Sequence, residues 1–216
     1  MRNSSKILLA AATAAGAAVV LVIGLTPAFA STTDVLTYGS SGGTNVTVNS
    51  SLSASLSSGT HATFYTTTSG TEGVTCTGSN VTQTVSSNPV APGTAHLSTT
   101  ALSYSGCTSN IFGFDTVEAA QVAGLPYTSS TADSGSNPVT ITGVIFRLLL
   151  SGSNGTEQCN YEVASGALTG SLTLTNQNYQ LYIDSDPTCP GNMYASSTYG
   201  TVHDKSVSGS PQVFLN

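Results

Sequence analysis

The sequence predicts an all-β protein, an antiparallel sandwich or barrel with at most one short helix near residues 116–123 and an N-terminal signal helix. Three observations support this fold class. Apolar and polar residues alternate with period two along much of the chain, as in strands with one buried face. Strand-length pieces are separated by turns rich in Gly, Ser, Asn and Pro. Ser and Thr make up 66 of the 216 residues, whereas Asp, Glu, Lys and Arg make up only 14.

The first thirty residues have the pattern of an export signal. Arg2 and Lys6 precede an apolar run over Ile7–Leu25, and the small-residue site Ala28-Phe29-Ala30 follows it. A positive head, an apolar body and an A-x-A site together direct secretion and cleavage. We therefore expect a signal peptide over 1–30, cleavage after Ala30, and a single secreted β domain over 31–216.

An uncleaved membrane anchor is the alternative for this segment. The apolar run has 19 residues, longer than the usual signal core of about 7–15, and a helix of that length would nearly span a bilayer. The run is rich in Ala rather than Leu, and Pro27 ends it just before the small-residue site. These features favour cleavage, and no membrane attachment is then expected for the remaining chain.

Removal of the signal makes the remaining chain more acidic. Arg147 and Lys205 are the only cations after residue 30 and all ten acids remain, which gives 2 − 10 = −8. A basic surface is needed to replace the counterions of nucleic acids, so nucleic-acid binding is excluded. Apolar side chains for a core are few, and we expect the fold to need covalent support.

Four cysteines are expected to supply that support as disulfides. An even number of cysteines in an exported chain is typical of a disulfide framework. Val81–Val85 alternates, a turn-rich stretch follows over Ser86–Gly93, and the chain returns toward Cys107. Such a hairpin would place Cys76 opposite Cys107. Pairing of Cys159 with Cys189 then follows by elimination.

Several other segments have the pattern of strands. The predicted strands are 45–56, in which Ser50 alone interrupts the apolar even positions, 62–68, a doubly buried central strand over 139–150, and a three-stranded meander over 159–183. A polar loop at 129–138 is a possible subdivision of the domain. Between these, Asp115-Thr116-Val117-Glu118 has the spacing of a helix capping box, and Gly124 and Pro126 would end a short helix. A strand over the same residues is the equal alternative.

Few residues carry candidate chemistry. Tyr179, Tyr182, Tyr194 and Tyr199 gather near the C-terminus and form a possible ligand platform. His203-Asp204 is interpreted as surface, because adjacent strand residues point to opposite faces. Asp184 and Asp186 are interpreted as a solvated turn rather than a calcium site. We expect no catalytic residue, no metal and no cofactor, since the nucleophile and nucleotide-binding motifs are missing from the sequence.

Four short motifs carry a resemblance to known proteins. They are Val74-Thr75-Cys76-Thr77, Tyr104-Ser105-Gly106-Cys107, Gly124-Leu125-Pro126-Tyr127 and Cys159-Asn160-Tyr161. With them the chain resembles small secreted β-rich proteins of actinobacteria that have no assigned function. It is also loosely similar to bacterial surface proteins linked to biofilms and growth on alkanes, in which a Trp usually stands at the position of Tyr127. The resemblance implies an exported β protein and brings no catalytic residue with it.

Three functions remain for this sequence. The first is a non-catalytic extracellular or cell-envelope protein that acts in surface or matrix interaction or in self-association, because charges that normally block strand addition are scarce. The second is a carbohydrate-binding module built on the tyrosines. The third is a small secreted hydrolase, which would require a cluster of Asp, Glu and His in one cleft.

Overall fold

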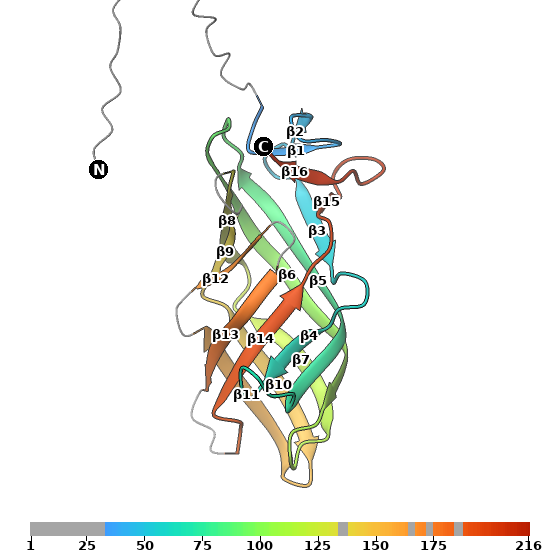
Figure 1. The fold of residues 1–216 in the computed structure, drawn as a ribbon, viewed down its shortest axis with the longest axis vertical. Helices are drawn as coiled ribbons and strands as arrows, with labels where there is room; N and C mark the ends of the chain where they lie inside the picture. Colours follow the sequence, from blue (N-terminus) through green and yellow to red (C-terminus); the bar gives the residue numbers. More distant parts are fainter. Residues whose placement is uncertain (1–32, 134–137, 164–166, 172–174, 184–187) are drawn as a thin grey trace, which may run out of the picture. The chain divides into compact units, whose positions relative to one another are not determined.

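The computed structural model describes residues 33–133, 138–163, 167–171, 175–183 and 188–216. Ser31–Asn216 form one compact unit. The described part contains sixteen strands and no helix, which confirms the all-β prediction (Figure 1). The strands are β1 (Leu36–Tyr38), β2 (Thr44–Asn45), β3 (Ser51–Ser55), β4 (Ala62–Tyr65), β5 (Gly73–Ser87), β6 (Thr94–Ser109), β7 (Thr116–Ala123), β8 (Tyr127–Ala132), β9 (Pro138–Thr142), β10 (Ile145–Gly152), β11 (Gly155–Val163), β12 (Ala167–Ser171), β13 (Thr175–Ile183), β14 (Asn192–Thr198), β15 (His203–Asp204) and β16 (Val213–Leu215).

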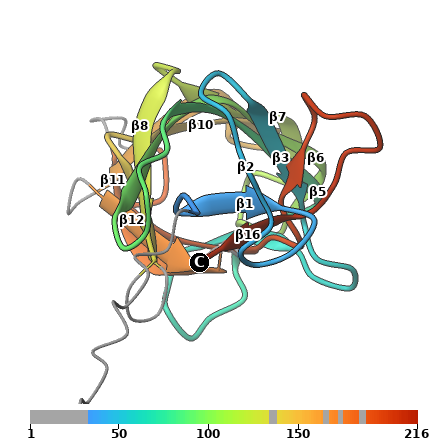
Figure 2. The ribbon, with the colours of Figure 1, turned by 90° about the horizontal axis from the view of Figure 1, so that it is seen from above.

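The strands form two antiparallel sheets. Thirteen strands lie in the order β12-β9-β8-β6-β7-β10-β11-β13-β14-β4-β5-β3-β15, and β5 also pairs with β6. The sheet therefore wraps around one core, with β6 joined to β7 through the single pair Ser103↔Gln121, in a sandwich-like arrangement rather than a regularly closed barrel. The second sheet, β16-β1-β2, lies across the upper end of the first (Figure 2).

The β5–β6 hairpin is the longest element and confirms the predicted one. Its two strands pair from Val74↔Ser109 to Ser87↔His96, and Cys76 lies directly opposite Cys107. These cysteines form a disulfide, and Cys159 and Cys189 form the second. Both predicted pairs are present, and the second ties β11 to the segment that leads into β14.

Residues 116–123 form strand β7 rather than a helix. The strand pairs with β10 over Ala123↔Ile145 to Thr116↔Ser151. A helix here would leave the backbone of the buried neighbour β10 without partners on one side, so tertiary pairing overrides the local capping pattern. The following turn brings the buried Tyr127 ring back to β10, where its hydroxyl accepts the N–H of Ile145 at 3.0 Å.

Two further strand predictions need correction. The predicted single strand over 139–150 is divided into β9 and β10, because Gly143 adopts φ +71° and turns the chain. In β10 one face alone is buried, by Phe146, Leu148 and Leu150, whereas Arg147 is exposed. The predicted meander over 159–183 is also wrong: β11 pairs directly with β13, and β12 pairs with β9.

The 45–56 prediction holds for its C-terminal half. β3 buries Leu52 and Ala54, as the alternation predicts. The chain turns before it, with Asn49 at φ 71°, so Val48 is exposed and the interrupting Ser50 is buried. Ser50 is hydrogen-bonded to Thr47 in this turn, with 3.0 Å between the hydroxyl oxygens.

The core combines an aromatic cluster with aliphatic side chains. Phe64 packs edge-on against Tyr104 and Phe146, with ring centroids 5.2 and 5.4 Å away. Above it, the side chain of Asn88 joins the small sheet to the end of β5 by donating to the carbonyls of Leu36 and Val46 at 2.9 and 2.8 Å. The upper sheet is thus attached to the main sheet by partly buried polar contacts as well as by apolar packing.

Removal of the hairpin disulfide tests its contribution to stability. A Cys76→Ala/Cys107→Ala variant should lose about 3–4 kcal/mol of unfolding free energy, because the open chain regains the entropy of a loop of this size. Denaturant unfolding of the exported protein, followed by circular dichroism, measures the loss.

The second disulfide provides the matched control. Cys159 and Cys189 are 30 residues apart, against 31 for the first pair, so their removal should cost a similar free energy in the chain-entropy model. A hairpin variant as stable as the unmodified protein would contradict this expectation.

Candidate binding site

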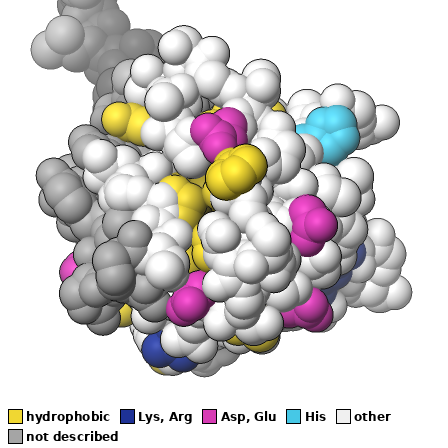
Figure 3. Space-filling model, turned by 90° about the horizontal axis from the view of Figure 1, so that it is seen from below, with side chains coloured by type: hydrophobic (Ala, Val, Ile, Leu, Met, Phe, Trp, Pro, Cys, Tyr) yellow, Lys and Arg dark blue, Asp and Glu magenta, His cyan; other side chains and the backbone are white. Residues whose placement is uncertain are grey.

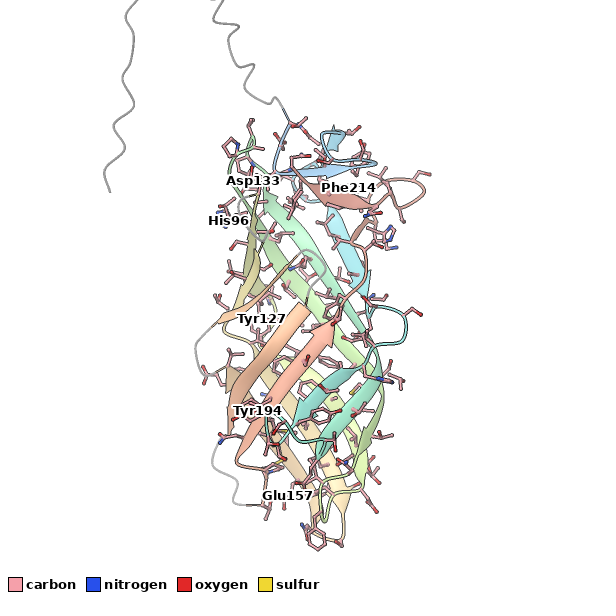
Figure 4. All side chains as sticks on the ribbon, in the orientation of Figure 1. His96, Tyr127, Asp133, Glu157, Tyr194 and Phe214 are labelled. Atoms are coloured by element: carbon pink, nitrogen blue, oxygen red, sulfur yellow. A yellow bond between two sulfur atoms is a disulfide. The ribbon has the colours of Figure 1, made fainter. Side chains whose placement is uncertain are left out.

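The four tyrosines of the expected platform do not share one surface. Tyr194 lies on the outer face near the lower end of β14 and is half-buried (Figure 4). Tyr199 lies on the inner face and is 4% exposed. Tyr179 and Tyr182 belong to β13, where their backbones pair with Ala195 and Asn192, and their side chains lie outside the described part. Tyr199 is therefore a core residue and not part of a ligand surface.

Tyr199 instead makes a buried hydrogen bond inside the sheet. Its hydroxyl shares a hydrogen bond of 2.7 Å with Ser79 Oγ. Burial raises the pKa of Tyr199 to about 12, and burial together with the neighbouring Tyr199 raises the pKa of Tyr104 well above its usual value. Both rings therefore remain protonated structural groups at neutral pH.

His203 and Asp204 also differ from their predicted surface position. They form the edge strand β15, and their side chains do point to opposite faces, but Asp204 is fully buried. Its Oδ1 accepts the backbone N–H of Ser206 at 2.9 Å, and its Oδ2 has no hydrogen-bond partner among the described residues. Pairing of β15 with β3 turns this side chain inward, which the polar composition of the segment does not reveal.

The half-buried His203 ring is held in one orientation. Its Nδ1 lies 2.8 Å from the carbonyl oxygen of Ser210, and its Nε2 lies 2.9 Å from Thr201 Oγ1. Since a carbonyl only accepts, the proton of the neutral ring is on Nδ1, and Nε2 accepts from the threonine hydroxyl. The nearest carboxyl in sequence, Asp204, faces the other way, so the two do not form an acid–base pair.

Two adjoining hollows on the outer side of β3 and β5 form the candidate binding site, which we call the β3–β5 groove. Their volumes are about 300 and 280 Å³, and both are lined by Ser55, Leu56 and Asn80. Other lining residues include Ser103 and Ser105 of β6 in the first hollow, and Thr201, His203 and Lys205 in the second. The groove is thus built from three neighbouring strands and the segment that follows β14.

Asn80 is the fixed centre of the groove. Ser55 and Asn80 are paired across β3 and β5. The Asn80 Oδ1 accepts from Ser53 Oγ at 3.2 Å, and its Nδ2 donates to Ser55 Oγ at 3.0 Å. At Gly78, a Cβ atom would meet the Ser105 hydroxyl, so the absence of a side chain keeps this part of the groove open.

The charge of the groove contrasts with that of the chain. The cation Lys205 lines it, whereas the whole chain has a formal charge of −6. The remaining polar groups are hydroxyls and one amide, which bind ligands by hydrogen bonds. Sequence patterns did not single out this site, because Ser and Thr are too frequent for one hydroxyl to be informative. The one sequence feature that could have indicated the site is Lys205, because it is one of only two cations after residue 30.

Metal-ligating side chains do not gather in the part of the chain that the structure describes. There, no group of three or more His, Cys, Asp and Glu residues is placed to hold a metal ion. Asp184 and Asp186, interpreted above as a solvated turn, lie outside the described residues. The groove therefore offers hydrogen bonding, one cation and an apolar side chain at Leu56.

The buried tyrosines predict a loss of stability in alkali. The folded-state pKa of Tyr199 lies above the unfolded value of about 10, so its contribution is complete below pH 10 and is lost as pH rises toward 12. The unfolding free energy should fall by about 1.4 kcal/mol per pH unit for each such tyrosine. Unfolding titrations between pH 9 and 12 should show a shallower fall for Tyr199→Phe, and an identical slope would contradict this account.

Comparisons with known proteins assign no family. No family model, no curated protein and no solved structure matches this chain. Among the described residues, no helix has the length and apolar character to cross a membrane. What the protein does has to be inferred from its own residues.

Proposed function

We propose that this chain is an exported, non-catalytic protein that acts at the cell envelope or in the extracellular matrix through contacts of its β surface, including contacts between copies. The pattern of residues 1–30 supports export. The two disulfides support an oxidising, extracellular environment. The actinobacterial resemblance supports the same location.

The lining of the β3–β5 groove is the observation that supports a non-catalytic function. Its hydrogen-bonding groups are hydroxyls held by one another and by Asn80, and no carboxylate lines it. General acid–base catalysis needs a titratable side chain that is free to exchange a proton with the substrate, whereas both ring nitrogens of His203 are engaged by Ser210 and Thr201. His203 lines the groove, but Asp204 is turned to the interior. This set of groups favours binding over a chemical step.

Carbohydrate binding is the second candidate function, and the groove is where a carbohydrate would bind. The hydroxyls and the Asn80 amide offer alternating donors and acceptors, and the two hollows of about 280–300 Å³ suit single sugar rings better than a large ligand. The proposed carbohydrate site is therefore the groove along β3, β5 and β6, and no longer the C-terminal tyrosines.

Export is tested by analysing the protein made by its own host. Intact-mass and N-terminal analysis should give a chain that begins at Ser31, recovered outside the cytoplasm with both disulfides formed. A full-length, reduced chain in the cytoplasm would overturn the proposal. If the exported chain still contained residues 1–30, the segment would act as an uncleaved anchor rather than as a cleaved signal peptide.

Carbohydrate binding is tested by sedimenting the exported protein with insoluble cell-wall glycan. Asn80→Ala should reduce the bound fraction at least about tenfold if the groove holds the sugar, since a buried polar contact is then lost. Arg147→Glu is the matched control, because it changes an exposed charge on β10 outside the groove. Equal binding by all three proteins would exclude the groove as the sugar site.

A further inference from the structure

Phe112 is the most exposed large apolar side chain of the described part. It is 90% exposed, compared with 53% for Val90 and 51% for Val48. Its neighbours Ile111 and Phe114 are 7% and 1% exposed. The tight turn between β6 and β7 therefore buries the apolar residues on both sides of Phe112 and presents Phe112 itself to solvent.

The turn that carries Phe112 is braced from two sides. Within it, Phe114 N–H donates to the Ile111 carbonyl at 2.9 Å, and Gly113 adopts φ +84°. From β10–β11, Asn154 N–H donates to the Gly113 carbonyl at 3.1 Å. From the first residue of β5, Gly73 N–H donates to Asn110 Oδ1 at 2.7 Å. A side chain presented on such a turn loses little freedom when it binds.

Carboxylates surround this turn. Glu72 Oε1 lies 3.5 Å from the Phe112 backbone nitrogen, which donates to it, and Asp115 follows the turn directly. Glu118 lies three residues further along, in β7, where it is exposed and accepts a hydrogen bond from Ser151 Oγ at 2.7 Å. Figure 3 shows this lower end, where acidic side chains are spread over the surface and one lies directly beside an exposed hydrophobic side chain. The exposed Phe112 ring is thus carried on a turn that has the carboxylates of Glu72 and Asp115 next to it.

We infer that the Phe112 turn of one copy docks into the β3–β5 groove of a second copy. This inference rests on the proposed contacts between copies and identifies their surfaces. The groove has what the turn lacks: the cation Lys205 to meet Glu72 and Asp115, and Leu56 to contact the ring. Opposite charges across an interface select this pairing, whereas two acidic turns repel each other.

The contact is between two different surfaces, so it does not close on itself as a two-fold dimer does. After two copies pair, one of them still has a free groove and the other still has a free turn. Heterologous contacts of this kind build open chains of copies unless their rotation closes a ring. Higher assemblies are therefore expected at high protein concentration.

Sedimentation analysis of the exported protein over a range of concentrations tests the inference. The average mass should rise with concentration, and Phe112→Ser and Lys205→Glu should each weaken association at least about tenfold, as expected for central contacts. Val90→Ser, which removes another exposed apolar side chain, should leave association unchanged. Because Phe112 and Lys205 are exposed, both variants should keep the circular dichroism spectrum of the unmodified protein.

Mixing the two variants makes the test specific for this geometry. Phe112→Ser keeps an intact groove, and Lys205→Glu keeps an intact turn, so an equimolar mixture should form dimers and no larger species. A two-fold interface made of either surface alone cannot be restored in this way.

Several results would overturn the inference. They are a monomer at all concentrations, association that survives Phe112→Ser, and a mixture that remains monomeric. Loss of envelope binding by Phe112→Ser without any change in self-association would assign the turn to an envelope protein instead. A monomer that still sediments with cell-wall material would remove this interface and leave the proposed envelope function standing.

Discussion

The β5–β6 hairpin is the element on which the other strands depend. β3 and β4 both pair with β5, whereas β7 and β8 both pair with β6. Cys76–Cys107 joins the two strands near the aromatic cluster, at directly opposite positions. A chain with few large apolar side chains has little core energy to hold separate sheets together. Here one long hydrogen-bonded hairpin holds the strands that pair with β5 in register with the strands that pair with β6.

The hydroxyl-rich composition continues into the interior. Gln83 Nε2 donates to Thr99 Oγ1 at 3.1 Å and to Ser129 Oγ at 2.8 Å, and all three residues are buried. Buried polar groups are tolerated when they satisfy one another. Ser and Thr can thus fill inner positions of the strands that Val or Leu usually occupy, and the fold does not require the apolar content of an average domain. Covalent cross-links supply the stability that this substitution removes.

The sequence alone was sufficient to predict the fold class, the hairpin and its disulfide from local alternation and the position of one turn, and the second disulfide then followed by elimination. It was insufficient wherever long-range pairing decides the structure. Residues 116–123 carry a helix capping pattern, yet they form β7 because β10 needs a partner. Asp204 belongs to a polar segment but is turned inward by pairing with β3. The β3–β5 groove joins residues as distant as Ser55 and Lys205, and no local pattern connects them.

The long hairpin also separates two surfaces of opposite character on a chain with few charged residues. The acidic turn follows the end of β6, whereas the groove with Lys205 lies beside β5 higher along the same hairpin. Charges are so few that each one changes its local surface strongly, and salt screens them only beyond a distance of about 8–10 Å. A uniformly charged surface would repel further copies at every approach. On a surface dominated by hydroxyls, one acidic turn and one groove with a cation leave few favourable approaches, so under the proposed docking the scarcity of charge would make contacts between copies specific.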